Sequence, residues 1–482
     1  MFYHSTRSCA PHVDSARAVL QGLAPDGGLY MPERIPAFDW QHCLTLSAQG
    51  QSCAILSALL PDIPDMQDLV EKAYTGKFQT EDLTPTVPAG DFHVLELFRG
   101  PTSAFKDVAL SMLPQLLTAS MKQCGAEKEI LILTATSGDT GKAALAGFAD
   151  VPGVKICVFY PDGGVSKVQR AQMVTQEGNN VTVCAVRGNF DDAQTGVKNI
   201  FSACRGKELP YDLSSANSIN IGRLAPQVMY YFKAYRDLLD AGRIALGETV
   251  NFSVPTGNFG DILAGYLAKL LGLPVGVLIC ASNANNVLTD FIRTGTYDKR
   301  RSLLKTTSPS MDILVSSNLE RLLYLMSGCD TELVAGLMNR LNTDGVYTVP
   351  ESMKAAIEKE FWADFCDDAH AADTIRKVWE ENHYLCDPHT ASGWAVAESY
   401  VKQTGDSRPM VVLSTASPYK FPAAVLEAIG GDLSGDEFDQ MEQLEAQTGI
   451  PIPQNLATLR GKQERHLGVI NKDEMLDFVL GL

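Results

Sequence analysis

The chain is 482 residues long, which is enough for two or three domains with a large buried core. Its 57 acidic and 40 basic residues give a formal net charge of −17, and this charge repels nucleic acids and anionic membrane surfaces. Every apolar run is shorter than the roughly 20 residues of a membrane helix, and the first residues lack the basic-then-apolar order of a signal peptide. We therefore expect a globular cytoplasmic protein with no nucleic-acid or membrane partner.

The 11 cysteines are scattered along the chain, and none of them forms a CxxC pair. This spacing indicates neither a disulfide framework nor a zinc site. We expect buried, reduced thiols and no bound metal ion.

Residues 1–90 have the composition of a separate opening unit. Pro and Gly are frequent in residues 22–36, GLAPDGGLYMPERIP. Apolar spacing predicts helices over Ser52–Leu60 and Leu69–Lys77, and the Pro- and Gly-rich stretch Leu83–Gly90 ends the unit. We expect a small N-terminal cap on the main domain.

From residue 93 onward, apolar runs rich in β-branched residues alternate with helical patterns. The predicted strands are 93–98, 129–135, 154–160, 181–187, 249–255, 275–281 and 410–416, and the predicted helices are 108–122, 141–149, 166–177, 192–204, 223–240 and 261–271. This alternation is typical of α/β proteins with doubly wound, mostly parallel sheets. Ligands of such sheets lie beyond the carboxyl ends of the strands, so the loops at those ends are expected to carry the function.

The part of the chain after the cap divides into two predicted α/β halves, residues 91–245 and 246–482. Residues 287–382 interrupt the second half with long helical patterns, such as Met353–Phe365, and no clear strand. We predict a helical insertion there.

The segment 97–107, LFRGPTSAFKD, places Lys106 at a junction between a strand and a helix. A strand-like run precedes a Gly-Pro turn, and the helical pattern begins at Asp107. Because Phe105 and an apolar helix flank the lysine, its stem is expected to be enclosed, and enclosure lowers the pKa of an amine as a Schiff-base lysine requires. A structural lysine whose stem covers apolar surface is the competing interpretation.

The loop after the predicted strand 129–135 brings hydroxyl and glycine residues to the start of a helix. Such a helix N-terminus presents N–H donors to an anion, for example a carboxylate. A Walker A loop is excluded, because its pattern needs glycine at Thr136 and serine or threonine at Ala143. An ordinary capped turn explains the loop equally well. The candidate residues are Ser137, Gly138, Asp139 and Thr140.

The loop 255–261, PTGNFGD, also joins a predicted strand to a helix. Its glycines, Gly257 and Gly260, let the backbone approach a ligand closely and turn several N–H groups toward one point. This geometry suits a dianionic phosphate.

Two further loops carry candidate ligands. Thr415 follows a predicted strand, where its hydroxyl can meet a heterocyclic nitrogen, although a turn before Pro418 explains it equally well. Residues 217–223, NSINIGR, offer amides and Arg223 to an anionic substrate, although a single arginine is more often a surface ion-pair partner. The four loops together match the requirements of a pyridoxal-phosphate site, which are an amine, a carboxylate cradle, a phosphate cradle and a partner for the ring nitrogen.

The chain resembles the threonine synthase family, which are pyridoxal-phosphate enzymes of the tryptophan-synthase-β fold type. The motifs that carry this resemblance run nearly from end to end. They are STR at 5–7, GLAPDGGLYMPE at 22–33, GPTSAFKD at 100–107, TSGDTGKAA at 136–144, GGVSKVQRAQM at 163–173, FDDAQ at 190–194, NSIN at 217–220, PTGNFGD at 255–261, SPSMDILVSSNLER at 308–321, DPHTASG at 387–393 and STASPYKFP at 414–422.

The resemblance implies a role for each candidate residue. Lys106 would hold the cofactor as a Schiff base, and Thr415 would face its pyridine nitrogen. The cofactor phosphate would be received by Gly257, Asn258, Phe259 and Gly260. Substrate would be bound by Ser137, Gly138, Asp139, Thr140, Asn217 and Arg223. The implied reaction converts O-phospho-L-homoserine and water into L-threonine and phosphate by γ-elimination and β-addition of water.

Three positions depart from the family pattern. Arg99, Ile221-Gly222 and Ser417 stand where the pattern has His, Trp-Ala and His. None of them removes the lysine, the phosphate loop or the ring partner. A phospholyase or dehydratase of the same fold, which releases a 2-oxo acid and ammonia, is the alternative function, whereas the presence of Lys106 argues against a non-catalytic binding protein. The oligomeric state stays open between monomer and homodimer.

Overall fold

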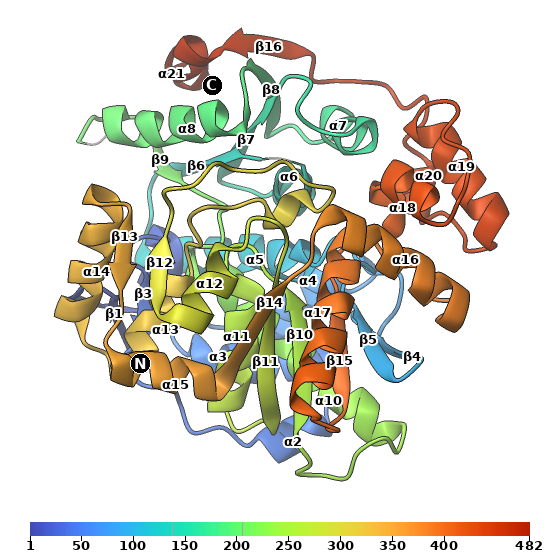
Figure 1. Cartoon of the computed structure of the whole chain (residues 1–482). Coiled ribbons are helices and arrows are strands. Elements are labelled where there is room, and N and C mark those ends of the chain that lie inside the picture. The colour runs from blue at the N-terminus through green and yellow to red at the C-terminus, as the bar shows by residue number, and fades with distance from the viewer. Residues whose placement is uncertain (137, 205) are drawn as a thin grey trace.

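The computed structural model of the chain describes residues 1–136, 138–204 and 206–482. Two large β-sheets occupy the upper and lower halves of Figure 1, and helices pack against both of them. The predicted fold class, a doubly wound and mostly parallel α/β protein, is confirmed.

The larger sheet has six strands in the order β14-β11-β10-β15-β5-β4. All neighbours are parallel except β4, which pairs antiparallel with β5 at the edge. Because the inner strands are buried on both faces, their sequences are continuous apolar runs. The strands are β4 (Thr86–Ala89), β5 (Phe92–Glu96), β10 (Val250–Pro255), β11 (Val275–Ser282), β14 (Phe361–Phe365) and β15 (Met410–Ser414), and α11 (Gly260–Leu270) and α17 (Pro388–Thr404) pack against them.

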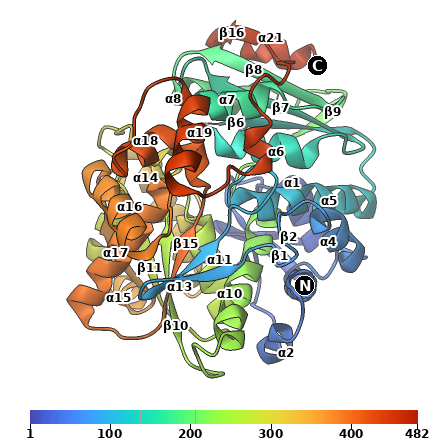
Figure 2. The same ribbon diagram turned by 90° about the vertical axis from the view of Figure 1, so that its right-hand side faces the viewer.

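The smaller sheet has five parallel strands in the order β16-β8-β7-β6-β9. Figure 2 shows it above the rest of the molecule, with β16 at its outer edge. Its strands are β6 (Glu129–Ala135), β7 (Val154–Pro161), β8 (Val181–Arg187), β9 (Tyr211–Ser214) and β16 (Gly468–Asn471), and its helices are α6 (Asp139–Phe148), α7 (Lys167–Val174) and α8 (Phe190–Cys204).

The N-terminal residues form a cap on α5 (Lys106–Cys124) and α10 (Val228–Asp240). Helices α1 and α4 pack against α5, and α3 packs against α10. Short elements, α9 (Ile221–Leu224) and η1 (Ala225–Gln227), lead into α10. The cap consists of β1 (Phe2–Ser5), β2 (Ser8–Asp14), β3 (Tyr30–Pro32), α1 (Ser15–Gln21), α2 (Trp40–Leu44), α3 (Ala48–Leu59) and α4 (Met66–Tyr74).

The predicted insertion is helical, but the expectation that it holds no strand is wrong. The helical pattern predicted over 353–365 ends at Glu360, and Phe361–Phe365 continues as β14, parallel to β11. Aromatic residues such as Phe361 and Trp362 favour strands, and pairing with β11 decides the conformation. The segment comprises α12 (Val287–Thr294), β12 (Thr296–Asp298), η2 (Pro309–Met311), α13 (Leu319–Met326), α14 (Thr331–Thr343), β13 (Val346–Thr348), α15 (Glu351–Glu360), β14 and α16 (Asp368–Asn382).

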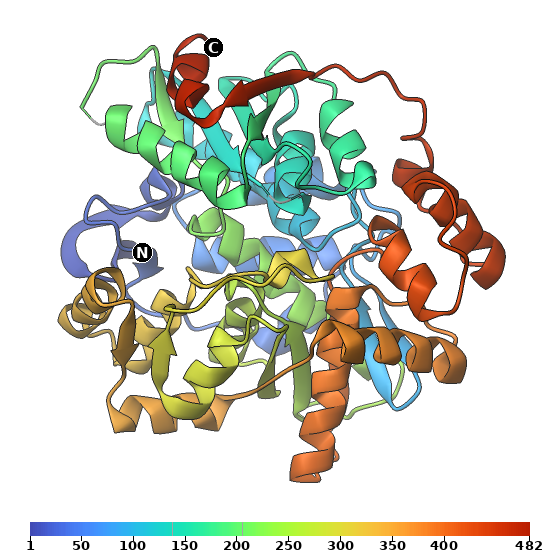
Figure 3. The same cartoon turned by 45° about the horizontal axis from the view of Figure 1, so that its top comes forward.

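The C-terminal segment runs from the larger sheet back to the smaller one, along the right side and top of Figure 3. Glu437 accepts a hydrogen bond from Val168 N at 3.0 Å, and Glu464 pairs with Arg170. Its elements are η3 (Pro418–Lys420), α18 (Pro422–Ala428), α19 (Glu437–Thr448), α20 (Gln454–Ala457), β16, η4 (Lys472–Glu474) and α21 (Met475–Leu480). The sheets therefore do not follow the predicted division at residue 245, because β5 joins the larger sheet and β16 joins the smaller one.

Among the described residues, the helices fall short of the length and apolar character that a membrane crossing requires.

Candidate active site

Lys106 is the first residue of α5, and the loop before it is fixed by Asp107. The Asp107 carboxylate accepts hydrogen bonds from Thr102 Oγ1 at 2.5 Å and from Thr102 N at 2.9 Å. A Cβ atom at Gly100 would lie 2.4 Å from Asp107 Cβ, so only glycine fits at this turn. Phe105 N donates to Thr415 O at 2.8 Å, which ties the loop to the end of β15.

The Lys106 amine is enclosed, as its sequence context predicts. The residue is 9% exposed, and Nζ donates to Ser310 Oγ at 3.3 Å. Burial lowers the pKa of Lys106 to about 8; the carboxylates of Asp139 and Asp261 oppose this shift, and two nearby cations add to it. About a tenth of the amine is therefore neutral near pH 7, which is far more than for an exposed lysine, and a nucleophilic lysine requires this neutral form.

The two cations that face Lys106 are Lys420 and Arg223, and they differ in their partners. Lys420 is fully buried, and its Nζ lies 2.6 Å from Asp139 Oδ1 and donates to Thr102 O at 3.1 Å. Arg223 is 3% exposed and donates from Nη1 to Ala216 O, while its Nε has no hydrogen-bond partner among the described residues.

Burial lowers the pKa of Arg223 to about 10, so the guanidinium stays charged at neutral pH. A buried charge that no carboxylate compensates is costly. Arg223 is therefore suited to bind an anion that enters the site. Asn217, predicted to act beside it, lies half-buried in a turn where its carbonyl accepts from Asn220 N at 3.3 Å.

The loop before α6 is held by Thr136 and Gln169. Thr136 Oγ1 accepts hydrogen bonds from Gly138 N at 3.0 Å and from Gly141 N at 2.9 Å. Gly138 has φ 141°, and a Cβ atom there would lie 2.5 Å from the Gln169 side chain. The predicted candidate Ser137 lies outside the described residues.

The Asp139 carboxylate is already engaged. Besides Lys420, it accepts from Gln169 Nε2 at 3.0 Å. Burial by itself would raise the pKa of Asp139, but Lys420 and Lys106 hold it well below its usual range. A fixed anion cannot attract a substrate carboxylate, so any binding by Asp139 and Thr140 has to come from backbone N–H groups in the first turn of α6.

The predicted phosphate loop lies at the start of α11, close to Ser310. A Cβ atom at Gly257 would lie 2.4 Å from the Ser310 carbonyl oxygen, so this position also requires glycine. Phe259 adopts φ 62° directly before α11 begins at Gly260, which turns the chain into the helix. Asn258 is exposed, and its carbonyl accepts from Asn318 N at 3.1 Å.

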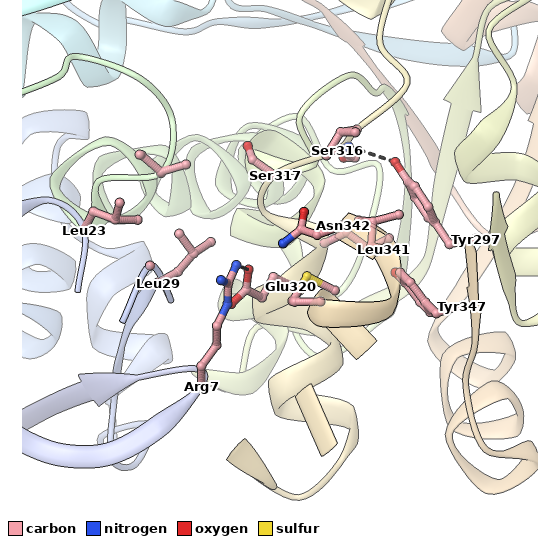
Figure 4. Close-up of a pocket in the computed structure, with 15 residues that line it drawn as sticks. Arg7, Leu23, Leu29, Tyr297, Ser316, Ser317, Glu320, Leu341, Asn342 and Tyr347 are labelled. Atoms are coloured by element: carbon pink, nitrogen blue, oxygen red, sulfur yellow. Dashed lines mark hydrogen bonds and ion pairs between the residues drawn. The ribbon is translucent and has the colours of Figure 1, made fainter. Parts of the chain in front are cut away.

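A cavity of about 190 Å³ lies behind this loop, between the cap and the insertion (Figure 4). Ser316, on its wall, donates from Oγ to Gly257 O at 2.8 Å, and Ser316 N donates to Tyr297 OH at 2.8 Å. Lys106 does not line this cavity. The two serine contacts support the phosphate loop from behind.

Thr415 lies buried at the end of β15, beside the lysine loop. Ser417 N donates to Ser103 O at 3.1 Å, and Ser417 Oγ accepts from Tyr419 N at 3.3 Å at the start of η3. The serine at this departure from the family pattern therefore caps the turn that carries Lys420.

The other two positions that depart from the family pattern, Arg99 and Ile221-Gly222, have different surroundings. Arg99 is half-exposed and forms an ion pair with Glu96 at 2.6 Å. A Cβ atom at Gly222 would lie 2.9 Å from Leu113 Cδ1, so glycine allows α9 to approach α5 closely.

Sequence reasoning missed Lys420, Ser310, His389 and Asp261. Lys420 carries a signal similar to that of Lys106, because both lysines follow a buried strand and come directly after an aromatic residue. Asp261 ends the phosphate motif, and burial raises its pKa to about 6 while the Lys106 charge opposes this shift. Ser310 and His389 lie in quoted motifs, but nothing local connects either of them to Lys106.

The residues present fit pyridoxal phosphate. An enclosed amine with a lowered pKa suits the cofactor aldehyde, and a glycine-bearing loop at the start of α11 suits its phosphate. The guanidinium of Arg223, whose Nε has no hydrogen-bond partner among the described residues, suits a further anion in the same site.

Comparisons with known proteins agree with this fit. Three family models match the chain, described as threonine synthase N terminus at residues 2–74, pyridoxal-phosphate dependent enzyme at residues 81–416 and threonine synthase C-terminal at residues 390–476.

Two relatives and one solved structure illustrate the similarity. Threonine synthase of Saccharomyces cerevisiae is 38% identical over 465 residues, with 89% of this chain and 89% of the relative covered. Threonine synthase-like 1 of Homo sapiens is 36% identical over 474 residues; the alignment covers 94% of this chain but only 63% of that longer protein. The crystal structure of PLP-bound threonine synthase from Brucella melitensis matches with TM-score 0.88 and 38% identity, covering 100% of this chain and 99% of that one. The chain therefore belongs to the threonine synthase family of pyridoxal-phosphate-dependent enzymes.

Proposed function

We propose that this protein converts O-phospho-L-homoserine and water into L-threonine and phosphate, the last step of threonine biosynthesis. The observation that carries the proposal is the buried Lys106 amine with its lowered pKa, near the charge of Arg223, for which the described residues provide no carboxylate partner and no hydrogen-bond partner at Nε. A reactive amine and an anion-binding cation in one enclosed site are what a phosphorylated amino-acid substrate requires.

The positions of three loops support the assignment of the cofactor residues. Lys106 would be the attachment point, Thr415 at the end of β15 would face the ring nitrogen, and the start of α11 would hold the cofactor phosphate. The N–H groups around Gly257, Asn258, Phe259 and Gly260 provide the donors for that phosphate. Pyridoxal phosphate, when bound, supplies an electron sink for negative charge at the substrate Cα.

The substrate residues are divided between two loops. The first turn of α6, with Asp139 and Thr140, binds the substrate carboxylate through backbone N–H groups, and Gly138, whose own N–H donates to Thr136 Oγ1, gives the turn its conformation. Arg223, assisted by Asn217, binds the substrate phosphate and stabilises it as it leaves.

Lys106 would also act as the general acid and base that moves protons on the substrate. Its pKa of about 8 lies close to neutral pH, where an amine both accepts and returns a proton efficiently. It removes a proton at Cα and moves protons at Cβ, while the Lys420–Asp139 pair keeps the α6 loop in place. We place the protein in the cytoplasm and leave monomer and homodimer open.

The test is to incubate the protein with O-phospho-L-homoserine and to measure phosphate, threonine and 2-oxobutanoate together. We expect threonine and phosphate in equal amounts, and no turnover by a Lys106→Ala variant. Mostly 2-oxobutanoate and ammonia would assign the chain to the phospholyase or dehydratase alternative.

A further inference from the structure

Ser310, in the short helix η2, connects three parts of the active site. Its hydroxyl accepts a hydrogen bond from Lys106 Nζ at 3.3 Å. Its carbonyl lies where a side chain at Gly257 would otherwise be, only 2.4 Å from the position of an added Cβ. Its backbone N–H donates to His389 Nε2 at 3.1 Å. The position of the hydroxyl is therefore set from both sides of the serine backbone.

His389 is itself held by Asp387 at the start of α17. Nδ1 of the ring lies 2.5 Å from Asp387 Oδ2, and the two side chains are 2% and 0% exposed. A backbone N–H can only donate, so His389 Nε2 is the acceptor and Nδ1 carries the hydrogen that Asp387 receives. This tautomer is the one that lets His389 anchor Ser310.

The helix cap does not need this histidine ring. Asp387 caps α17 by accepting from His389 N at 3.0 Å and Thr390 N at 3.1 Å, and these bonds involve only backbone N–H groups. The imidazole ring adds a second function, because its other nitrogen reaches a residue 79 positions away in the chain.

We propose that Asp387 and His389 are positioning residues that hold the Ser310 hydroxyl against the Lys106 amine. A neutral amine has two N–H bonds and one lone pair, so donating one N–H to Ser310 restricts rotation about the Cε–Nζ bond. The lone pair is thereby limited to the two remaining positions around Nζ, which narrows the directions from which the amine can attack an electrophile. This inference rests on the proposed role of Lys106 as the reactive amine.

The other charges around the amine come from different elements. Asp139 on α6 and Asp261 on α11 favour the protonated form, and Lys420 on η3 and Arg223 on α9 disfavour it. Ser310 adds an uncharged acceptor, which stabilises the ammonium more than the amine. Removal of its hydroxyl should therefore lower the pH at which Lys106 titrates.

The experiment measures this titration on the full chain after reversible removal of the cofactor, without any substrate. Trace labelling with acetic anhydride between about pH 6 and pH 10, followed by peptide mass spectrometry, gives the midpoint for Lys106. We expect Ser310→Ala to lower this midpoint by about 0.5–1 pH unit, and His389→Phe to lower it in the same direction by no more. The double variant should have the same midpoint as Ser310→Ala alone, because both substitutions act through the same contact between Ser310 and Lys106.

Two control variants and one replacement variant make the result decisive. Ser310→Thr keeps the hydroxyl and should keep the wild-type midpoint. Thr390→Val removes a different hydrogen bond to Asp387 and should also keep it. Asp387→Asn keeps one acceptor oxygen for the helix cap but removes the carboxylate that pairs with His389 Nδ1, and it replaces His389→Phe if that variant does not fold. Reloading with pyridoxal phosphate, followed by its visible absorbance, should be slowed by Ser310→Ala and His389→Phe only.

An unchanged midpoint in Ser310→Ala would overturn the proposal. So would a shift in Ser310→Ala together with a wild-type midpoint in His389→Phe or its replacement, since the histidine would then be merely structural. Because the labelling uses neither substrate nor turnover, its outcome is independent of whether the protein makes threonine.

Discussion

The start of α5 and the turn η3 each bury a lysine beside the same site, but the two lysines have different partners. Lys420 is fully buried and lies 2.6 Å from the Asp139 carboxylate, so its charge is compensated. Lys106 has the Ser310 hydroxyl as its hydrogen-bond partner, and burial lowers its pKa to about 8. Burial alone therefore does not make a lysine reactive. The partner decides the difference: a carboxylate holds one amine in an ion pair, whereas a hydroxyl leaves the other with a lowered pKa and available as a nucleophile.

The largest expected effect comes from removing the reactive lysine. Lys106→Ala should reduce turnover by at least about a thousandfold, because the proposed attachment point and proton carrier are both lost. Cofactor absorbance and the rate of threonine formation measure this effect. Retained turnover in Lys106→Ala would mean that another residue carries the chemistry.

Removal of the compensated lysine should act on stability instead. Lys420→Met leaves Asp139 buried without its partner, and breaking such a pair costs about 3–5 kcal/mol of unfolding free energy. Urea unfolding measures the loss. The double variant Lys420→Met, Asp139→Asn should recover much of it, and failure to recover would show that Lys420 stabilises the fold in some other way.

The uncompensated arginine should matter for the substrate rather than for the fold. Arg223→Gln should raise the KM for O-phospho-L-homoserine about 10- to 100-fold, the range of a hydrogen bond to a charged group. The unfolding free energy should not fall, because a buried unpaired charge is removed. Arg99→Gln is the matched control, since this arginine is half-exposed and paired with Glu96. Equal effects of both changes would remove the assigned role.

The smallest expected effect concerns the phosphate loop. Gly257→Val should weaken cofactor binding by more than about tenfold, because the new side chain meets the Ser310 carbonyl. Gly260→Ala is the control, since an added Cβ there has its nearest neighbour, Asn318 Nδ2, at 3.4 Å. Cofactor titration followed by absorbance compares the two variants. Equal affinity in both would place the phosphate elsewhere.

The sequence predicts the two sheets well because their inner strands are buried, parallel and rich in β-branched residues. The predicted strands 129–135 and 181–187 have the observed bounds. Edge strands leave weaker patterns: β4 contains Pro88, and β16 has four residues. The strand β14 is hidden because no Gly or Pro separates it from α15, and only its pairing with β11 reveals it.

The residues of the candidate site can likewise be predicted only where their signal is local in the sequence. Lys106, Gly257 and Thr415 stand in loops whose position after a strand is visible locally, and their roles stay predictions until they are tested. The partner of Lys106 is not visible locally, because Ser310 lies 204 positions further along the chain. The same holds for Lys420, whose carboxylate partner Asp139 is the first residue of α6, a helix of the smaller sheet.

The most direct test of the account is to reduce the cofactor-bound protein with borohydride and to map the labelled peptide. The central claim is that the lysine with the hydroxyl partner, and not the one with the carboxylate partner, bears the cofactor. The account predicts that the label is found on Lys106 alone. A label on Lys420 would contradict it, since a lysine paired with Asp139 at 2.6 Å would then be the reactive one.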